Sequence, residues 1–243
     1  DEIAKEVHKE NLGIELANKR KLGCLLWMDD VVLLSETHTE LQKMLDITDR
    51  IAGKYHIEFG KEKSKLLTMN VLKPLQPKLG DMVLEHTNSY KYLGETLNKR
   101  FDMGDQIQAI KGKTEGAIQI VFALAGDDNF NGIHMETMWK LTEACVIPII
   151  TYANETWTPS AKEWEDLNRI LDSLIKRILI LPVSTPREVL YMETGLFDVQ
   201  HLHKRDKLNM MGRLRGPQNW IIEGTLNNPK PNSWAKSSSQ LAT

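Results

Sequence analysis

The sequence predicts an α+β fold, in which short strands and helices alternate up to about residue 100 and helices alone follow. Before residue 100, apolar runs of strand length are separated by turn residues. From about residue 104 to residue 215, apolar residues recur at helical spacing. With 243 residues, the chain has room for one large domain or two small ones.

The first third of the chain is predicted to contain one β-hairpin followed by a helix. Residues 2–10 have the pattern of a helix end, and the apolar runs 22–27 and 31–34 are separated by a short polar segment, as in a hairpin. Thr37 and Glu40 have capping-box spacing, which predicts the start of a helix over residues 37–55.

The next segment predicts further short strands. Residues 57–59 and 66–69 flank the basic loop 60–65, and Pro74, Pro77 and Gly80 indicate a loop. Residues 82–84 and 90–93 are expected to form a second small hairpin closed by Gly94.

The helical region shows its own start and stop signals. Ser160 and Glu163 have capping-box spacing, Thr185 and Pro186 predict a helix that Gly195 ends, and Asp198 begins a last helix. Residues 216–243 are rich in Asn, Pro, Ser and Lys and lack periodicity, so we expect a loose tail.

Composition excludes several classes of protein. Cys24 and Cys145 are too few and too far apart for a disulfide framework or a zinc site, which favours an intracellular location. No apolar run approaches the roughly 20 residues of a membrane span, so we expect no membrane partner. The chain lacks a signal-peptide pattern and an initiator Met, and we expect it to be a piece of a longer protein.

The net charge of −2 conceals a block pattern of charge. Residues 61–113 and 169–215 are basic, whereas 1–60 and 114–168 are acidic. Basic blocks can bind phosphates, although the solvated faces of amphipathic helices give the same pattern.

Two adjacent aspartates, Asp29 and Asp30, lie between the strands of the first predicted hairpin. Carboxylates on a rigid turn suit hard cations such as Mg²⁺, which take carboxylate and phosphate oxygens. Two such ions can stabilise the attacking and leaving oxygens of a phosphoryl transfer. Aspartate is also a common turn residue, and strand alternation directs neighbouring side chains to opposite sides.

Residues 27–34, Trp-Met-Asp-Asp-Val-Val-Leu-Leu, resemble the aromatic-x-Asp-Asp element, motif C, of reverse transcriptases. The helix over 37–55 and the stretch 55–65 are similar to motif D, and residues 90–94, Tyr-Lys-Tyr-Leu-Gly, resemble motif E, the primer grip. These elements occur in the family's order, which makes them stronger together than each is alone.

The helical region resembles the non-LTR (LINE-type) retrotransposon subgroup. Pro148, Tyr152, Glu155 and Trp157 look like its Pro…Tyr-x-x-Glu-x-Trp stretch, and residues 181–195 are also similar. The resemblance implies part of a polymerase palm over 1–100, a small antiparallel sheet with helices. An all-α thumb and connection region over 101–215 and a loose tail over 216–243 would follow.

The sequence also departs from that family. Trp27 replaces the usual Tyr, Met28 the usual Ala, and His56 the motif-D glycine. Motif A, which carries a third catalytic aspartate, and motif B would lie upstream of residue 1. The resemblance therefore implies a nucleotidyltransferase fragment that is inactive alone and that needs the upstream half of the polymerase as a partner.

The resemblance also implies roles for individual residues. Asp29 and Asp30 would bind Mg²⁺ or Mn²⁺ as catalytic ligands, and Lys63 would lie near the nucleotide phosphates, although a solvated loop lysine is the alternative. Residues expected to contact primer, template or other nucleic acid are Trp27, Met28, Tyr90, Tyr92, Gly94, Lys65, Lys176 and Arg177. The same thumb face is expected to include Lys204, Arg205, Lys207, Arg213 and Arg215.

Three further expectations concern burial. One of Tyr90 and Tyr92 is expected to be buried and the other exposed. Trp157 and Trp164 are expected to be core aromatics rather than stacking platforms.

The implied activity is RNA-directed DNA polymerisation on an RNA template, with a DNA primer and deoxynucleoside triphosphates, in the nucleus or cytoplasm of a host cell. A degenerate or domesticated remnant that binds nucleic acid or protein without catalysis is the alternative. A group II intron maturase is a third possibility, disfavoured by the retrotransposon-like stretches.

Overall fold

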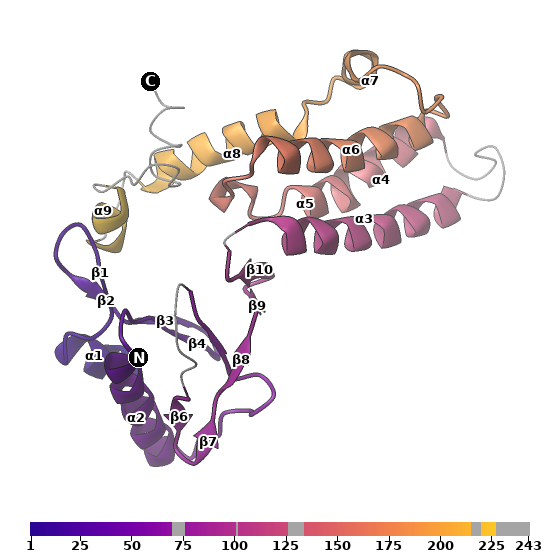
Figure 1. The fold of residues 1–243 in the computed structure, drawn as a ribbon. Coiled ribbons are helices and arrows are strands. Elements are labelled where there is room, and N and C mark those ends of the chain that lie inside the picture. The colour runs from indigo at the N-terminus through magenta and orange to yellow at the C-terminus, as the bar shows by residue number, and fades with distance from the viewer. Residues whose placement is uncertain (70–75, 101, 126–133, 215–219, 227–243) are drawn as a thin grey trace. The chain divides into compact units, whose positions relative to one another are not determined.

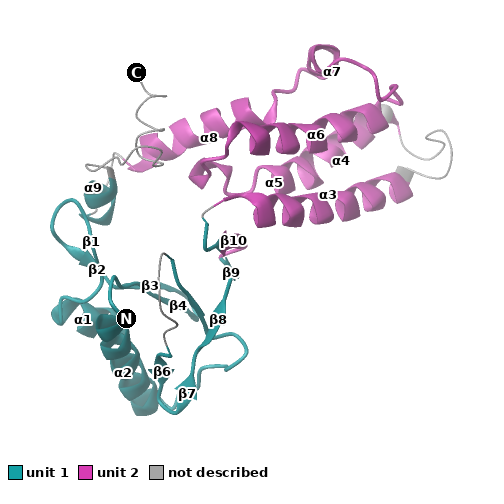
Figure 2. Cartoon of the chain, viewed as in Figure 1, with its two compact units in different colours: residues 1–92, 98–100, 217–231 teal, residues 93–97, 101–216, 232–243 magenta. Residues whose placement is uncertain are grey.

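The computed structural model describes residues 1–69, 76–100, 102–125, 134–214 and 220–226. Two compact units are formed, and Figure 2 colours them separately. Unit 1 comprises residues 1–92, 98–100 and 217–231, and unit 2 comprises 93–97, 101–216 and 232–243. Strands and helices mix in unit 1 while helices dominate unit 2, so the predicted α+β class is confirmed. Among the described residues, no helix is both long and apolar enough to cross a membrane.

Unit 1 begins with two helices and two antiparallel strand pairs, β1–β2 and β3–β4 (Figure 1). Helix α2 begins as predicted, because the Thr37 hydroxyl accepts a hydrogen bond from the Glu40 amide at 3.2 Å. The elements are α1 (Glu2–Lys9), β1 (Ile14–Glu15), β2 (Lys21–Leu22), β3 (Cys24–Trp27), β4 (Asp30–Leu33) and α2 (His38–Tyr55).

The later strands of unit 1 differ from the sequence-based expectation. Residues 57–59 form no strand, and the predicted hairpin of 82–84 with 90–93 is wrong. Strand β7 pairs with β6 instead, because Gly80 takes a left-handed φ of +57° in the turn between them. The elements are β5 (Lys65–Leu67), β6 (Lys78–Leu79), β7 (Met82–Val83), β8 (Glu85–Thr87), β9 (Ser89–Tyr92) and β10 (Glu95–Asn98).

One strand pair is parallel. Strand β5 pairs with β8, with Lys65 opposite Glu85. The family resemblance implied a small antiparallel sheet. The β5–β8 pair departs from that expectation, because its strands are parallel. The parallel pair places the lysine-containing loop before β5 close to the strands that follow β8.

Helix α2 supplies much of the unit 1 core. Its buried face packs on one side against α1, which in turn contacts β3, and on the other against β6. Met44 is fully buried beside Val7 and Leu12, and Leu45 packs with the β5 and β6 leucines Leu66 and Leu79. This packing fixes the base of the β3–β4 hairpin, since Leu33 contacts both clusters.

Unit 2 is a bundle in which α3, α4 and α6 run side by side (Figure 1). Helix α6 begins at the predicted capping box, with the Ser160 hydroxyl bound to the Glu163 amide and the Glu163 carboxylate bound to the Ser160 amide. The elements are α3 (Gly104–Ala125), α4 (Met135–Cys145), α5 (Ile147–Ile150), the 3₁₀ helix η1 (Asn154–Thr156), α6 (Ala161–Ile178), α7 (Arg187–Thr194) and α8 (Val199–Leu214).

The core of unit 2 lies between these helices. Leu167, Leu171 and Ile178 of α6 are fully buried in it, together with Met138 of α4. Trp157 is only 3% exposed, and Trp164 packs against the same core, so both are core aromatics as expected.

Residues 220–226 form helix α9 (Trp220–Leu226), within the segment where we expected only a loose tail. The helix belongs to unit 1. Its Gly224 carbonyl accepts a hydrogen bond from the Ala17 amide at 3.2 Å, and Trp220 stacks near His8 and beneath the Arg20 guanidinium. Long-range contacts stabilise this helix, and local sequence periodicity gives no signal of them. Residues 215–219 and 227–243 lie outside the described residues.

Candidate functional site

The two aspartates lie at the tip of the β3–β4 hairpin. Trp27 pairs with Asp30, so Met28 and Asp29 form a two-residue turn. Met28 has a left-handed φ of +52°, which interrupts strand alternation between Trp27 and Asp30. Both aspartates are exposed, and so are Trp27 (58%) and Met28 (92%). The hairpin therefore presents two neighbouring carboxylates and an aromatic ring to solvent.

The lysine-containing loop is a tight turn closed by its own backbone. The amides of Lys63 and Ser64 both donate to the Gly60 carbonyl, at 3.1 and 3.0 Å. The side chain of Lys63 is exposed. Lys65 differs, because its ammonium forms an ion pair with Glu85 at 2.6 Å and strengthens the β5–β8 pairing. A nucleic-acid role for Lys65 stays a prediction, and it would compete with this ion pair.

The backbone conformation at His56 favours glycine, the residue that the family resemblance led us to expect there. His56 follows the last residue of α2 with a left-handed φ of +55°, and its amide donates to the Ala52 and Gly53 carbonyls. Glycine adopts this conformation without a steric penalty. Histidine keeps the turn at some cost in free energy.

Strand β9 is linked to both the lysine loop and the aspartate hairpin. Tyr90 forms a hydrogen bond with the loop, and Tyr92 feels the charge of the hairpin. The Tyr90 hydroxyl donates to the Lys63 carbonyl at 2.9 Å. Partial burial raises the pKa of Tyr92, and the negative charge of Asp30 raises it further. The aspartates, the lysine loop and the tyrosine strand therefore form one region of unit 1.

The expectation that one of the two tyrosines is buried and the other exposed is wrong. Tyr90 and Tyr92 are both half-buried, and Lys91 between them is exposed. Residues two apart in a strand share a face, so both rings lie on the same side of β9.

Gly94 lies in the turn between β9 and β10 with a left-handed φ of +86°. A Cβ there would approach the Tyr152 ring to 3.0 Å, and the Tyr152 hydroxyl donates to the Leu93 carbonyl at 2.8 Å. Trp157 likewise donates its indole N–H to Glu95 at 2.6 Å. The Tyr152 and Trp157 side chains thus anchor residues 93–95 within unit 2.

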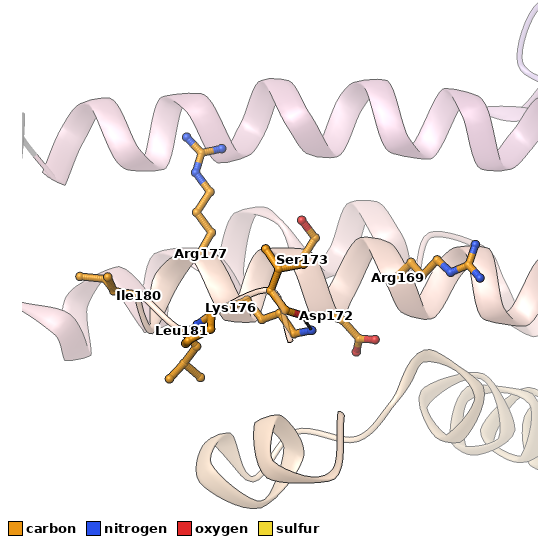
Figure 3. A pocket seen from close by; sticks show the side chains of 9 residues that line it. Arg169, Asp172, Ser173, Lys176, Arg177, Ile180 and Leu181 are labelled. Atoms are coloured by element: carbon orange, nitrogen blue, oxygen red, sulfur yellow. Dashed lines mark hydrogen bonds between the residues drawn. The ribbon is translucent and has the colours of Figure 1, made fainter. Parts of the chain in front are cut away.

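Two of the predicted nucleic-acid contacts lie at the C-terminal end of α6, around a concavity of about 760 Å³ (Figure 3). The Lys176 ammonium donates to the Val183 carbonyl at 2.6 Å, and the Arg177 guanidinium lies 4.4 Å from the Phe122 ring centroid. Both contacts hold local structure. A role in binding phosphates stays a prediction for each.

Lys207 does not belong to the predicted thumb surface. It is fully buried, and its ammonium lies 3.4 Å from the Trp157 carbonyl oxygen. Burial lowers its pKa to about 8. Arg205 and Arg213 are exposed, Lys204 is partly exposed, and Arg215 lies outside the described residues.

The donor set of the hairpin fits a divalent cation in part. Carboxylate oxygens are the ligands that Mg²⁺ prefers, and Asp29 and Asp30 offer two adjacent carboxylates. Among the described residues, no group of three or more His, Cys, Asp or Glu side chains could hold a metal ion. A cation held here would therefore need further oxygen ligands from a substrate or another segment.

Sequence reasoning missed the bond between Tyr90 and Lys63. The two residues are 27 positions apart, and a tyrosine hydroxyl bound to a backbone carbonyl leaves no pattern in the sequence. The parallel pairing of β5 with β8, which brings the two segments together, was also not predicted.

Comparison with known proteins gives one informative relative. The chain is 23% identical over 208 residues to an uncharacterized transposon-derived protein of Caenorhabditis elegans, covering 84% of this chain and 69% of the relative. No protein-family model matches the chain. The chain is therefore similar to a protein described as transposon-derived.

Proposed function

We propose that this chain is the C-terminal palm and thumb portion of a reverse transcriptase of the non-LTR retrotransposon type. The observation that carries the proposal is the grouping of the Asp29–Asp30 hairpin, the Lys63 loop and the tyrosine strand in unit 1. The transposon-derived relative supports it independently.

In the proposed reaction, a primer 3′-hydroxyl attacks the α-phosphate of a deoxynucleoside triphosphate and pyrophosphate leaves. Asp29 and Asp30 would hold Mg²⁺ or Mn²⁺, which when bound supplies positive charge to the phosphate oxygens. Lys63 would supply a flexible cation to the charge of the leaving pyrophosphate. The exposed Trp27 ring offers a flat surface beside the carboxylates.

A third carboxylate is part of this proposal, because the described residues supply only the adjacent pair at the hairpin tip. We propose that a segment outside this sequence provides it. The chain alone would then bind nucleic acid and lack polymerase activity.

Primer extension tests the proposal. The chain is expressed alone and joined to the coding sequence immediately upstream, and each is given an RNA template, a DNA primer, deoxynucleoside triphosphates and Mg²⁺. We expect extension only by the joined protein, with Asp29→Asn lowering the rate at least about 100-fold. Asp46→Asn, an exposed aspartate on α2, is the matched control and should leave the rate unchanged.

Two other results would contradict parts of the proposal. Robust Asp29-dependent extension by the chain alone would refute the need for a third carboxylate from elsewhere. A joined protein without polymerase activity, but with a salt-dependent gel shift on nucleic acid, would favour the non-catalytic remnant.

A further inference from the structure

We infer that Tyr90 is a positioning residue for Lys63: its hydroxyl fixes the backbone that carries the lysine side chain, in the same region of unit 1 as the Asp29–Asp30 hairpin. The inference rests on the proposed function, and it assigns to Tyr90 a task other than direct contact with a primer. Its basis is the 2.9 Å hydrogen bond from the Tyr90 hydroxyl to the Lys63 carbonyl.

Lys63 is a lysine of the loop that is available for a phosphate. Lys65 is not, because it forms an ion pair with Glu85 at 2.6 Å. The Lys63 ammonium has no ion-pair partner among the described residues, and its side chain is exposed. A ligand phosphate would therefore meet the Lys63 ammonium without breaking an existing ion pair.

The Lys63 backbone is restrained from two sides. Its amide donates to the Gly60 carbonyl at 3.1 Å, which closes the turn on the N-terminal side. Its carbonyl accepts the Tyr90 hydroxyl, which attaches the turn to strand β9. Without the hydroxyl, the loop would lose this attachment to β9.

Strand β9 connects this restraint to the aspartates. Tyr90 and Tyr92 share one face of the strand, and the charge of Asp30 acts on Tyr92. A lysine stem has four rotatable carbons, so fixing its backbone reduces the volume that the ammonium samples. Small misplacement of a charged group that binds a reacting phosphate has large effects on rate.

The test removes one oxygen atom from the full chain. Tyr90→Phe keeps the ring and deletes the hydrogen bond to Lys63. Tyr55→Phe is the matched control, because its hydroxyl donates to Glu2 at 2.6 Å, away from the loop. Hydrogen exchange of a peptide covering residues 60–65 should be about 2- to 10-fold faster in Tyr90→Phe and unchanged in Tyr55→Phe.

A double-mutant cycle separates positioning from general stability. In the protein joined to its upstream coding sequence, titration with Mg²⁺ and dTTP measures nucleotide affinity for the unaltered form, Tyr90→Phe, Lys63→Ala and the double variant. We expect Tyr90→Phe to weaken binding about 2- to 10-fold when Lys63 is present and to have no effect when Lys63 is alanine. Asp29→Asn should abolish the binding.

The outcomes distinguish the inference from the proposed function. Unchanged exchange in Tyr90→Phe, or equal effects of Tyr90→Phe with and without Lys63, would overturn the positioning role alone. Absence of saturable, Asp29-dependent nucleotide binding by the joined protein would overturn the proposed function, and the positioning role with it.

Discussion

Replacing the buried Lys207 with methionine should stabilise the protein at neutral pH. The side chain is fully buried on α8, and burial lowers its pKa from the ordinary 10.5 to about 8. That difference corresponds to a penalty of about 3 kcal/mol for keeping the lysine charged in the folded state. Methionine has a similar shape and carries no charge, so it removes this penalty.

Part of the gain is offset by a lost contact. The Lys207 ammonium donates to the Trp157 carbonyl at 3.4 Å, a long hydrogen bond. Leaving a buried carbonyl without this donor costs about 1 kcal/mol or more. The substitution also removes a further polar or electrostatic interaction of Lys207, so we expect the free energy of unfolding at pH 7 to rise by less than about 2 kcal/mol.

The sign of the pH dependence follows from the direction of the shift. Between about pH 8 and 10.5, Lys207 is neutral in the folded chain and still protonated in the unfolded chain, so folding releases a proton. The stability of the unaltered protein therefore rises with pH in this window relative to the variant. The advantage of Lys207→Met should be greatest below pH 8 and should shrink as pH increases.

Urea unfolding monitored by circular dichroism at pH 7, 8, 9 and 10 measures the difference. Lys113→Met is the matched control, because Lys113 is exposed on α3 of the same unit, and it should change stability by less than about 0.5 kcal/mol. A Lys207→Met variant that is less stable at pH 7, or a difference that does not vary with pH, would refute the reasoning.

Three further predictions concern single side chains. His56→Gly should raise the free energy of unfolding of unit 1 by about 0.5–1 kcal/mol in urea, because φ is +55° there; a decrease would contradict the left-handed turn. Gly224→Ala should speed hydrogen exchange of the Ala17 amide, because the added Cβ would lie 2.8 Å from the Leu16 Cβ. Gly53→Ala is the control: its Cβ would meet nothing within 4 Å, and exchange at Ala17 should stay unchanged. Leu171→Ala should destabilise unit 2 by about 2–5 kcal/mol in thermal unfolding, and a loss below about 1 kcal/mol would show that the site is not a packed core.

Local signals in the sequence predicted much of the fold. The capping residues Thr37 and Ser160 bind the amides of Glu40 and Glu163 as their spacing indicates. Gly195 ends α7 with a left-handed φ of +66°. These signals are reliable because each hydrogen bond joins residues at most four positions apart.

The candidate site was only partly predictable. The hairpin with Asp29 at its turn was expected from the apolar runs on either side. Its connections to β9 were not, because they depend on how β5 and β8 pair. The family resemblance assigned Lys63 to the nucleotide phosphates and Lys65 to nucleic acid, but the ion pair of Lys65 with Glu85 is visible only in the folded chain.

By itself the sequence determined where the helices begin, where the aspartate turn lies and which helix faces are apolar. Only the tertiary structure decided that Lys207 is buried, that α9 packs on unit 1 and that Tyr90 binds the Lys63 carbonyl. The physical reason is how far apart in the sequence the interacting residues lie. Caps and turns are settled within a few residues, whereas burial and long-range bonds depend on which surfaces meet once the whole chain has folded.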